Sequence, residues 1–198
     1  MGWKNAEEML FWTKEEFQTF IQAFHDRPTG YAVFMTLYYT GMREGELLAL
    51  TPSDVDLDKA TIRINKSFQR LGGEDLVSSP KTVRSNRVIT IPEGLLTCLK
   101  DYMAQMYGLQ PDSRLFPCSK AFLYREMEYG CTATGVKRIR VHDLRHSHAS
   151  LLVEMGFSPL LIAERLGHER VQTNLETYSH LYPNKQTEVA RQLDSVML

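Results

Sequence analysis

Apolar residues recur at the spacing of an α-helix through most of the chain. Near the N-terminus, Phe17, Phe20 and Phe24 fall on one helix face. Thr13, with Glu16 three residues later, forms a capping box and marks the start of that helix. By the same reasoning, helices are predicted over residues 13–24, 31–41, 44–50, 93–106, 120–130, 142–156, 159–167 and 184–197.

Two segments have the pattern of β-strands. They are ATIRINKSF at 60–68 and SNRVITI at 85–91, and they bracket a loop that contains Gly72 and Gly73. β-branched residues favour extended backbone, and paired glycines favour a turn. The predicted fold class is therefore mainly α with a small antiparallel β-sheet (α+β). With 198 residues, the chain suits one domain.

The composition limits the class of protein. Hydrophobic residues make up 43% of the chain, enough for a core. No apolar run approaches the roughly 18 residues of a membrane span. The three cysteines Cys98, Cys118 and Cys131 are odd in number and widely spaced. We therefore expect a cytoplasmic protein with reduced thiols and no membrane partner.

The charge is segregated along the chain. The net charge of −1 argues against a nucleic-acid-binding protein, but binding responds to the local field. Between Thr61 and Ile91, six lysines and arginines stand against two acids; between Lys137 and His148, four stand against one. These basic stretches predict DNA contacts by Arg84, Arg87, Lys137, Arg138 and Arg140.

Several polar residues have an ordinary structural explanation when each is taken alone. In TGMREGELLAL, Arg43 at a helix start and Glu46 would form a surface ion pair. Lys81, in SSPKTVRSNRVITIP, would be a solvated lysine where a loop meets a strand. His168, after a glycine, would mark a helix end, and Tyr178 would be a core or interface residue.

The segment VHDLRHSHASLL is densely polar at a helix start. His142 and Arg145 share a helix face, and Asp143 is predicted to cap the helix. His146, four residues after His142, makes a zinc site conceivable. Arg145 lies between the two histidines, however, and a cation beside a divalent metal is unfavourable. No second histidine-rich segment supplies further ligands, so no metal is expected.

Together these residues match phosphodiester transfer by a tyrosine. Its transition state carries extra negative charge on the non-bridging oxygens, and arginine offers a planar fork for two of them. A phenol has a pKa of about 10, so a base or a positive field must promote its ionisation. The leaving 5′-oxygen needs a proton, which a lysine can supply. Such a set of cationic side chains needs no metal or other cofactor.

The whole pattern resembles the tyrosine recombinases, or phage-type integrases. The motifs TGMREGELLAL, SPKTVRSNRVITIP, HDLRHSHASLLVEMG and IAERLGHERVQTNLETYSHL carry the resemblance, in the family order across residues 40–181. The resemblance implies the catalytic-domain fold of that family. It also implies that Tyr178 is the nucleophile that forms a 3′-phosphotyrosine.

The other roles follow from the same resemblance. Arg43 and Arg145 would clamp the scissile phosphate, and Lys81 would be the general acid on the 5′-hydroxyl. His142 would accept a proton or contact the phosphate, and His168 would donate a further hydrogen bond to it. A supporting role without DNA contact would fall to Glu46. The remaining histidines of these motifs have no counterpart.

The resemblance further implies a larger assembly. Family members usually carry an N-terminal core-binding domain, and phage and transposon integrases often add an arm-binding domain. About forty residues precede Arg43, so residues 1–198 are expected to be one catalytic domain. We favour a domain cut from a longer integrase over a naturally short protein. The expected partners are double-stranded DNA, a homotetramer on DNA, and accessory DNA-bending or directionality factors. The expected setting is a bacterial host of a phage or conjugative transposon.

Site-specific recombination or integration is the leading function, and other interpretations stay open. A type IB topoisomerase would use the same chemistry to relax DNA. A DNA-binding module of the same fold would have lost catalysis, and a metal phosphohydrolase is the most distant alternative.

The segment after Tyr178 carries an apolar stripe at Val189, Leu193, Val196 and Met197, typical of an amphipathic helix. It would pack on its own domain or, as the resemblance suggests, dock on a neighbouring protomer.

Overall fold

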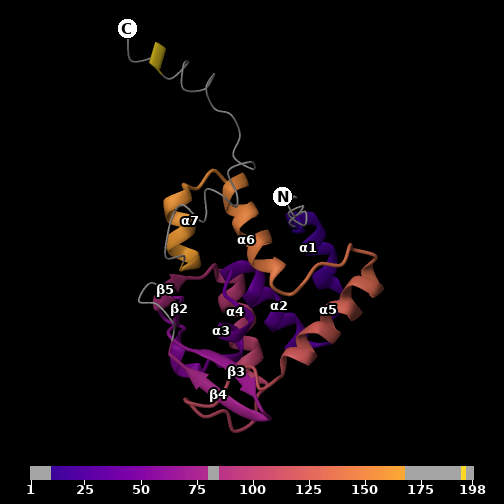
Figure 1. Cartoon of the computed structure of the whole chain (residues 1–198), viewed down its shortest axis with the longest axis vertical. Helices are drawn as coiled ribbons and strands as arrows, with labels where there is room; N and C mark the ends of the chain where they lie inside the picture. Colours follow the sequence, from indigo (N-terminus) through magenta and orange to yellow (C-terminus); the bar gives the residue numbers. More distant parts are fainter. Residues whose placement is uncertain (1–9, 80–84, 168–192, 195–198) are drawn as a thin grey trace, which may run out of the picture.

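The computed structural model describes residues 10–79, 85–167 and 193–194, which form a mainly helical domain with small antiparallel sheets, as predicted (Figure 1). The helices are α1 (Lys14–Ile21), α2 (Pro28–Thr40), α3 (Glu44–Ala49), α4 (Glu93–Ala104), α5 (Lys120–Thr134), α6 (Asp143–Glu154) and α7 (Pro159–Leu166). The strands are β1 (Val55–Asp56), β2 (Thr61–Ile64), β3 (Ser67–Leu71), β4 (Glu74–Ser78) and β5 (Arg87–Thr90), and 3₁₀ turns lie at Gln22–Phe24 and Pro52–Asp54. Within these ranges, none of the helices has the length and apolar character that a membrane crossing requires.

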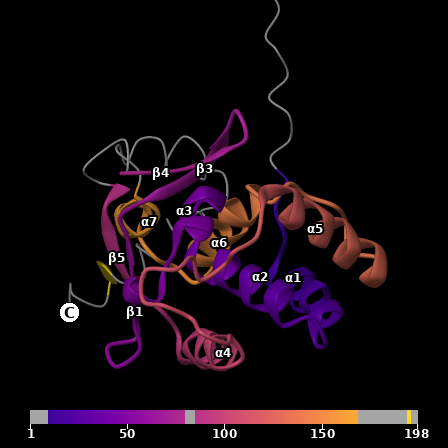
Figure 2. The ribbon, with the colours of Figure 1, turned by 90° about the horizontal axis from the view of Figure 1, so that it is seen from below.

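The capping box predicted from the sequence begins α1. Thr13 Oγ1 accepts the backbone N–H of Glu16 at 3.3 Å, and Glu16 Oε2 accepts the N–H of Thr13 at 2.8 Å. The cap orients the helix so that Phe17 stacks on Tyr38 of α2, with ring centroids 3.7 Å apart. Figure 2 shows α1, α2 and α5 lying together. Phe17 and Phe20 of α1 and Phe34 and Tyr38 of α2 are buried in the main core, where Leu123 and Met127 of α5 are also buried.

Two helix boundaries differ from the prediction for physical reasons. α2 begins at Pro28 instead of residue 31, because proline has a φ suited to the first turn and lacks the N–H that would be unpaired there. α5 continues past Gly130, its predicted end. A side chain at Gly130 would collide with Phe20, so this glycine permits close helix packing, and Gly135 (φ 74°) ends the helix instead.

The sheet also differs from the prediction in two respects. β2 pairs antiparallel with β5, as expected, and β1 adds a third strand. The predicted strand 60–68 breaks after Ile64, however, and its second half, β3, pairs with β4. The reason is that Gly72 and Gly73, with φ of 59° and 90°, close a two-residue hairpin turn of their own.

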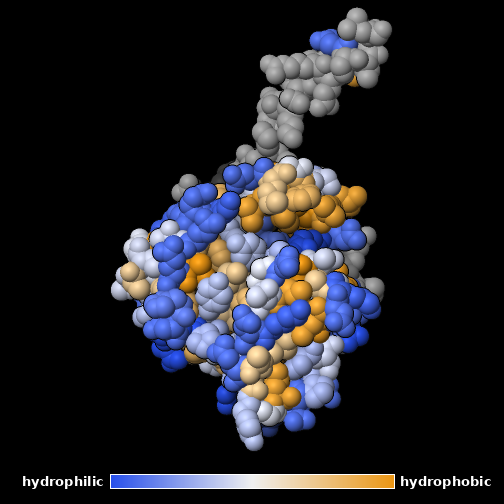
Figure 3. Space-filling model, turned by 180° about the vertical axis from the view of Figure 1, so that it is seen from behind, coloured by the Kyte–Doolittle hydropathy of each residue, from blue (hydrophilic) through white to orange (hydrophobic). Residues whose placement is uncertain are grey.

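A second, smaller core joins α6 to α7. Its buried residues are Ala149, Val153, Ile162 and Leu166. This unit lies at the opposite end of the molecule from the β3–β4 hairpin (Figure 1). Phe157, Leu160 and Leu161 remain exposed there, and Figure 3 shows hydrophobic surface gathered over this end.

Candidate active site

Arg43 stands at the N-terminus of α3, where its position is fixed by Glu46. The Arg43 backbone N–H donates to Glu46 Oε2 at 2.9 Å, and Arg43 Nη1 donates to Glu46 Oε1 at 2.8 Å. The Arg43 side chain is 40% exposed, whereas that of Glu46 is 6% exposed. The predicted surface ion pair is therefore half-buried: the Glu46 carboxylate lies inside the protein, and the Arg43 guanidinium bound to it is partly exposed to solvent.

Glu46 is also bound by a second arginine, Arg87 on β5. Arg87 Nη2 donates to Glu46 Oε2 at 2.9 Å, and Arg87 Nη1 donates to Glu46 Oε1 at 3.2 Å. Burial by itself would raise the pKa of Glu46, but the hydrogen bonds and charge of Arg87, followed by those of Arg43, outweigh it and lower the pKa. The carboxylate is therefore ionised and acts as an anchor.

Arg145 on α6 is buried, and its planar fork joins the ends of two helices. Nη1 donates to the carbonyl of Gly41, which caps α2, and Nη2 donates to that of Leu166, the last residue of α7, each at 2.8 Å. Helix C-termini leave carbonyls without internal partners and attract positive charge. The guanidinium of Arg145 is thus bound to a carbonyl only two positions before Arg43 in the chain.

His142 joins Arg43 at a surface hollow of about 810 Å³. The histidine immediately precedes α6. The hollow is also lined by the basic side chains Arg70, Arg114 and Lys120 and by the acidic side chains Glu44 and Asp75, with which they form ion pairs. Desolvation and then the charge of Arg145 lower the pKa of His142 below 6.5, so the ring is neutral at pH 7 and able to accept a proton. Four basic side chains against two acidic ones give the hollow a net positive charge beside a proton acceptor.

The two other histidines of α6 have pKa values that burial lowers, so both rings are neutral at pH 7. Burial, followed by repulsion from His142 once that ring is protonated in acid, lowers the pKa of His146 to about 4. The two rings meet edge to face with centroids 5.4 Å apart. Burial, followed by the charge of Arg165, lowers the pKa of His148 to about 3. Arg165 Nε donates to His148 Nε2 at 3.1 Å.

Asp143 does not cap α6, contrary to the prediction. Residue 142 occupies the N-cap position, and the buried Asp143 carboxylate instead accepts the backbone N–H of Arg140 at 2.9 Å and its guanidinium at 3.0–3.2 Å. This pairing fixes the turn that leads into α6 and holds the Arg140 side chain against the domain.

The residues predicted to contact DNA that the structure describes fall into two groups. Lys137, Arg138 and Arg140 have exposed side chains near the start of α6, each paired with an acid: Glu16, Glu128 and Asp143 respectively. Arg87 is 9% exposed and is bound to Glu46. Its burial argues against the predicted contact with DNA, because a guanidinium that neutralises a buried carboxylate cannot leave it without a large cost.

Four predicted site residues, Lys81, Arg84, His168 and Tyr178, lie outside the described residues. The described chain stops close to three of them. Ser79 and Ser85 flank the segment that contains Lys81 and Arg84, and Gly167, with φ 69°, precedes His168. In the ranges that the structure does describe, no group of three or more histidines, cysteines and acids is arranged to hold a metal.

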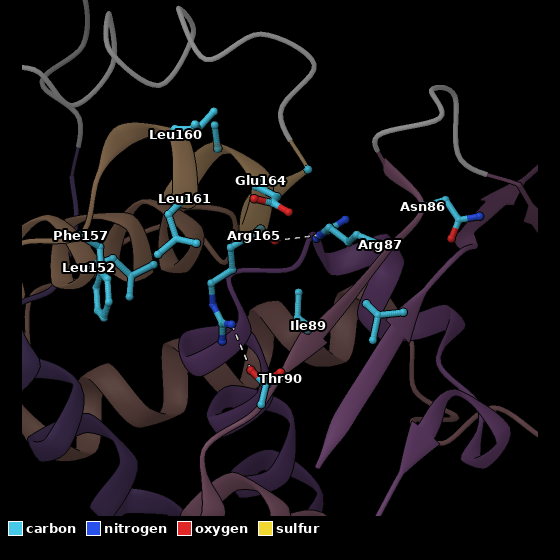
Figure 4. A pocket seen from close by; sticks show the side chains of 13 residues that line it. Asn86, Arg87, Ile89, Thr90, Leu152, Phe157, Leu160, Leu161, Glu164 and Arg165 are labelled. Carbon is cyan, nitrogen blue, oxygen red and sulfur yellow. Dashed lines mark hydrogen bonds between the residues drawn. The ribbon is translucent and has the colours of Figure 1, made fainter. Parts of the chain in front are cut away.

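A second hollow, of about 900 Å³, separates β5 from α7 and reveals a residue that the sequence did not single out (Figure 4). Arg165 lies at its floor, and its guanidinium donates to the carbonyls of Thr90 at 3.0 Å and Tyr39 at 3.1 Å. The signal available in the sequence is weak: Arg165 is simply a basic residue in the last turn of a helix. It joins α7 to the sheet and to α2.

Comparison with known proteins assigns the chain to a family. The chain belongs to the phage integrase family, whose model matches residues 11–185. The ICEBs1 integrase of Bacillus subtilis (strain 168) is 37% identical over 205 residues, which cover 96% of this chain and 56% of that protein. The integrase of Staphylococcus phage L54a is 30% identical, covering 80% of this chain and 49% of that protein. The chain thus spans about half the length of these relatives.

Solved structures agree on the fold. The Tn1549 transposon integrase in complex with circular intermediate DNA superimposes with a TM-score of 0.79 at 18% identity, covering 98% of this chain and 68% of that one. XerA recombinase gives a TM-score of 0.72 at 24% identity, covering 96% and 66%. The catalytic domain of bacteriophage HP1 integrase gives 0.66 at 21% identity, covering 93% and 95%. The fold is that of a tyrosine recombinase catalytic domain.

Proposed function

We propose that this chain is the catalytic domain of a site-specific tyrosine recombinase from a phage or conjugative transposon. The observation that carries the proposal is the convergence of Arg43, Arg145 and His142 on one turn after α2. The Arg145 guanidinium donates a hydrogen bond to the carbonyl of Gly41, two residues before Arg43, and Arg43 and His142 line the same hollow. Two guanidinium groups beside a neutral imidazole suit a phosphodiester with developing negative charge.

In the proposed reaction, the Tyr178 Oη attacks the scissile phosphorus and the bond to the 5′-oxygen breaks. His142 receives the phenolic proton, and Lys81 gives a proton to the leaving oxygen. Arg43 and Arg145, with His168, bind the non-bridging oxygens. Attack by a 5′-hydroxyl on the 3′-phosphotyrosine reverses these steps and rejoins the strand. The phosphotyrosine conserves the bond energy, so the steps need neither metal nor nucleotide.

The proposed partner is double-stranded DNA in the cytoplasm of a bacterial host. Support comes from the hollow in which Arg43, Arg70, Arg114 and Lys120 outnumber the acids Glu44 and Asp75, and from the DNA in the structure of the related Tn1549 integrase. The exposed side chains of Lys137, Arg138 and Arg140, near the start of α6, would extend this DNA-binding surface. We further propose a homotetramer on DNA, accessory DNA-bending or directionality factors, and N-terminal core-binding and arm-binding domains in the whole protein.

Covalent trapping tests the proposal. The chain is incubated in excess EDTA, without ATP, with nicked duplexes of randomised sequence around the nick, and adducts are resolved under denaturing conditions. We expect a protein–DNA adduct with the wild-type chain and with Tyr182→Phe, a matched neighbouring tyrosine, but none with Tyr178→Phe. An adduct from Tyr178→Phe would move the nucleophile elsewhere, and strict dependence on magnesium would point to a different mechanism.

A further inference from the structure

Arg87 joins three parts of the site through one buried guanidinium. Besides its two bonds to Glu46, Arg87 Nε donates to the carbonyl of Arg165 at 2.9 Å, as Figure 4 shows. Arg87 Nη1 also donates to the carbonyl of Ser85 at 3.1 Å, next to the segment that contains Lys81. The side chain is held by α3, by the last turn of α7 and by the residue two positions before it, ahead of β5.

The first consequence is electrostatic. Glu46 is 6% exposed, and both of its oxygens accept from both Arg43 and Arg87. The single carboxylate neutralises one of the two guanidinium groups, so the cluster of Arg43, Glu46 and Arg87 keeps a net charge of +1. Without Arg87, the Arg43 charge would be fully matched by the buried Glu46 carboxylate, and its attraction for a phosphate would fall.

The second consequence is geometric. Two neighbouring carbonyls at the end of α7 are bound by different arginines, that of Arg165 by Arg87 and that of Leu166 by Arg145. Gly167 follows directly in a left-handed conformation. Arg87 therefore fixes the same turn that orients the buried clamp residue Arg145, and it does so from the strand that also anchors Glu46.

We infer that Arg87 is a positioning residue for the phosphate clamp: by matching the charge of Glu46 it leaves Arg43 free for the phosphate, and by binding the Arg165 carbonyl it fixes the end of α7 beside Arg145. This inference rests on the proposed function. It replaces the DNA contact predicted for Arg87 with an indirect role. Among the influences that lower the pKa of Glu46, those of Arg87 are the largest, ahead of those of Arg43.

Cleavage kinetics form the first test. Arg87→Met should slow single-turnover adduct formation on nicked DNA by on the order of 100-fold, the scale of a misplaced catalytic group, with DNA affinity nearly unchanged. Arg87→Lys keeps the charge but loses the planar fork, so its rate of adduct formation should lie between those of the wild-type chain and Arg87→Met. Arg63→Met, on the adjacent strand β2 with a side chain 54% exposed, is the matched control and should cleave normally.

A double variant separates positioning from a general structural role. In Arg87→Met with Glu46→Gln, no buried carboxylate competes for Arg43, so cleavage should recover about 10-fold relative to Arg87→Met alone. Additive losses would overturn the charge-matching role. Thermal melts of each variant check folding, and the double variant avoids leaving a buried carboxylate with a single partner.

A measurement without DNA keeps the inference testable apart from the proposed function. Carbon-13 NMR of the glutamate carboxyl groups, assigned with Glu46→Gln, reports the pKa of Glu46. We expect that pKa to rise in Arg87→Met and to stay unchanged in Arg63→Met. An unchanged Glu46 pKa in Arg87→Met would refute the coupling. A wild-type chain that forms no adduct while the Glu46 shift is observed would refute the proposed function alone.

Discussion

The Nη1 group of Arg145 donates to the carbonyl oxygen of Gly41 at 2.8 Å, across 104 positions of the chain. The bond ties the polar helix α6 to the turn from which Arg43 projects. Gly41 has φ 64°, and a side chain there would lie 2.6 Å from both His148 and Leu166. The same glycine thus caps α2, receives the buried arginine and leaves room for two neighbours.

Gly41→Ala should therefore destabilise the domain and impair cleavage. Left-handed strain and overpacking together should cost about 2–5 kcal/mol in the free energy of unfolding. Gly72→Ala is the matched control, because Gly72 has φ 59° but a methyl group there would meet nothing within 4 Å, so strain alone should cost about 1 kcal/mol. Urea unfolding measures both values. Equal losses of unfolding free energy in the two variants would mean that the close packing around Gly41 does not add to the cost of the substitution.

His148 should make the domain sensitive to acid. Its pKa is lowered to about 3 in the folded protein, so below about 6.5 the unfolded chain binds a proton that the folded state does not. Stability should fall as the pH drops from about 6.5 towards 3, by up to about 1.4 kcal/mol per pH unit from this group. His148→Gln, which can still accept from Arg165, should flatten this slope in urea unfolding.

His25→Gln provides the control for that experiment. The His25 side chain is 83% exposed, so this substitution should leave the slope of stability against pH unchanged. If His148→Gln retained the full wild-type slope, the acid sensitivity would have to arise from other groups, such as His146.

Lys81 should act as the general acid. Lys81→Ala should cleave an ordinary phosphodiester slowly, because the 5′-oxygen then leaves without a proton. A substrate with a 5′-bridging phosphorothiolate has a better leaving group and should largely restore the rate of adduct formation. Equal slowing on both substrates would make Lys81 a positioning residue instead.

DNA binding by this chain alone should be weak and steeply dependent on salt. The net charge is −1, and the basic residues are concentrated in two stretches of the sequence. Phosphate contacts should then dominate, and the affinity should fall linearly on a log–log plot against salt concentration. Titration of a short labelled duplex at several salt concentrations measures the slope. Tight binding that ignores salt would contradict this prediction.

The C-terminal segment should couple cleavage to assembly. Most of the predicted stripe lies outside the described residues, but Leu193 is described and is 55% exposed. Deletion of residues 184–198 should leave the fold and DNA binding nearly intact while reducing protomer association on a two-site substrate. Asp194→Asn, next to the stripe, is a mild control. Unfolding of the truncated chain at low concentration would instead place the segment in the core of its own domain.

The sequence alone determined the elements whose signals are local. The capping box of Thr13 and Glu16, the glycine cap of α2 and the apolar spacing of α6 and α7 depend on neighbours within a few residues, so their helices were predictable. The order of the motifs around Arg43, His142 and Arg145 likewise identified the family, because chemistry of this kind constrains residue types at fixed spacing.

Only the tertiary structure decided the roles that depend on distant partners. By its local sequence Gly130 resembles a helix end, but Phe20 packs against it; Arg87 resembles a DNA contact, but Glu46 and the end of α7 enclose it. The sequence shows that a residue is charged but not which groups surround it in the folded protein. Burial decides whether that charge meets solvent and DNA or neutralises a carboxylate inside the protein, because desolvation makes an unpaired buried charge too costly.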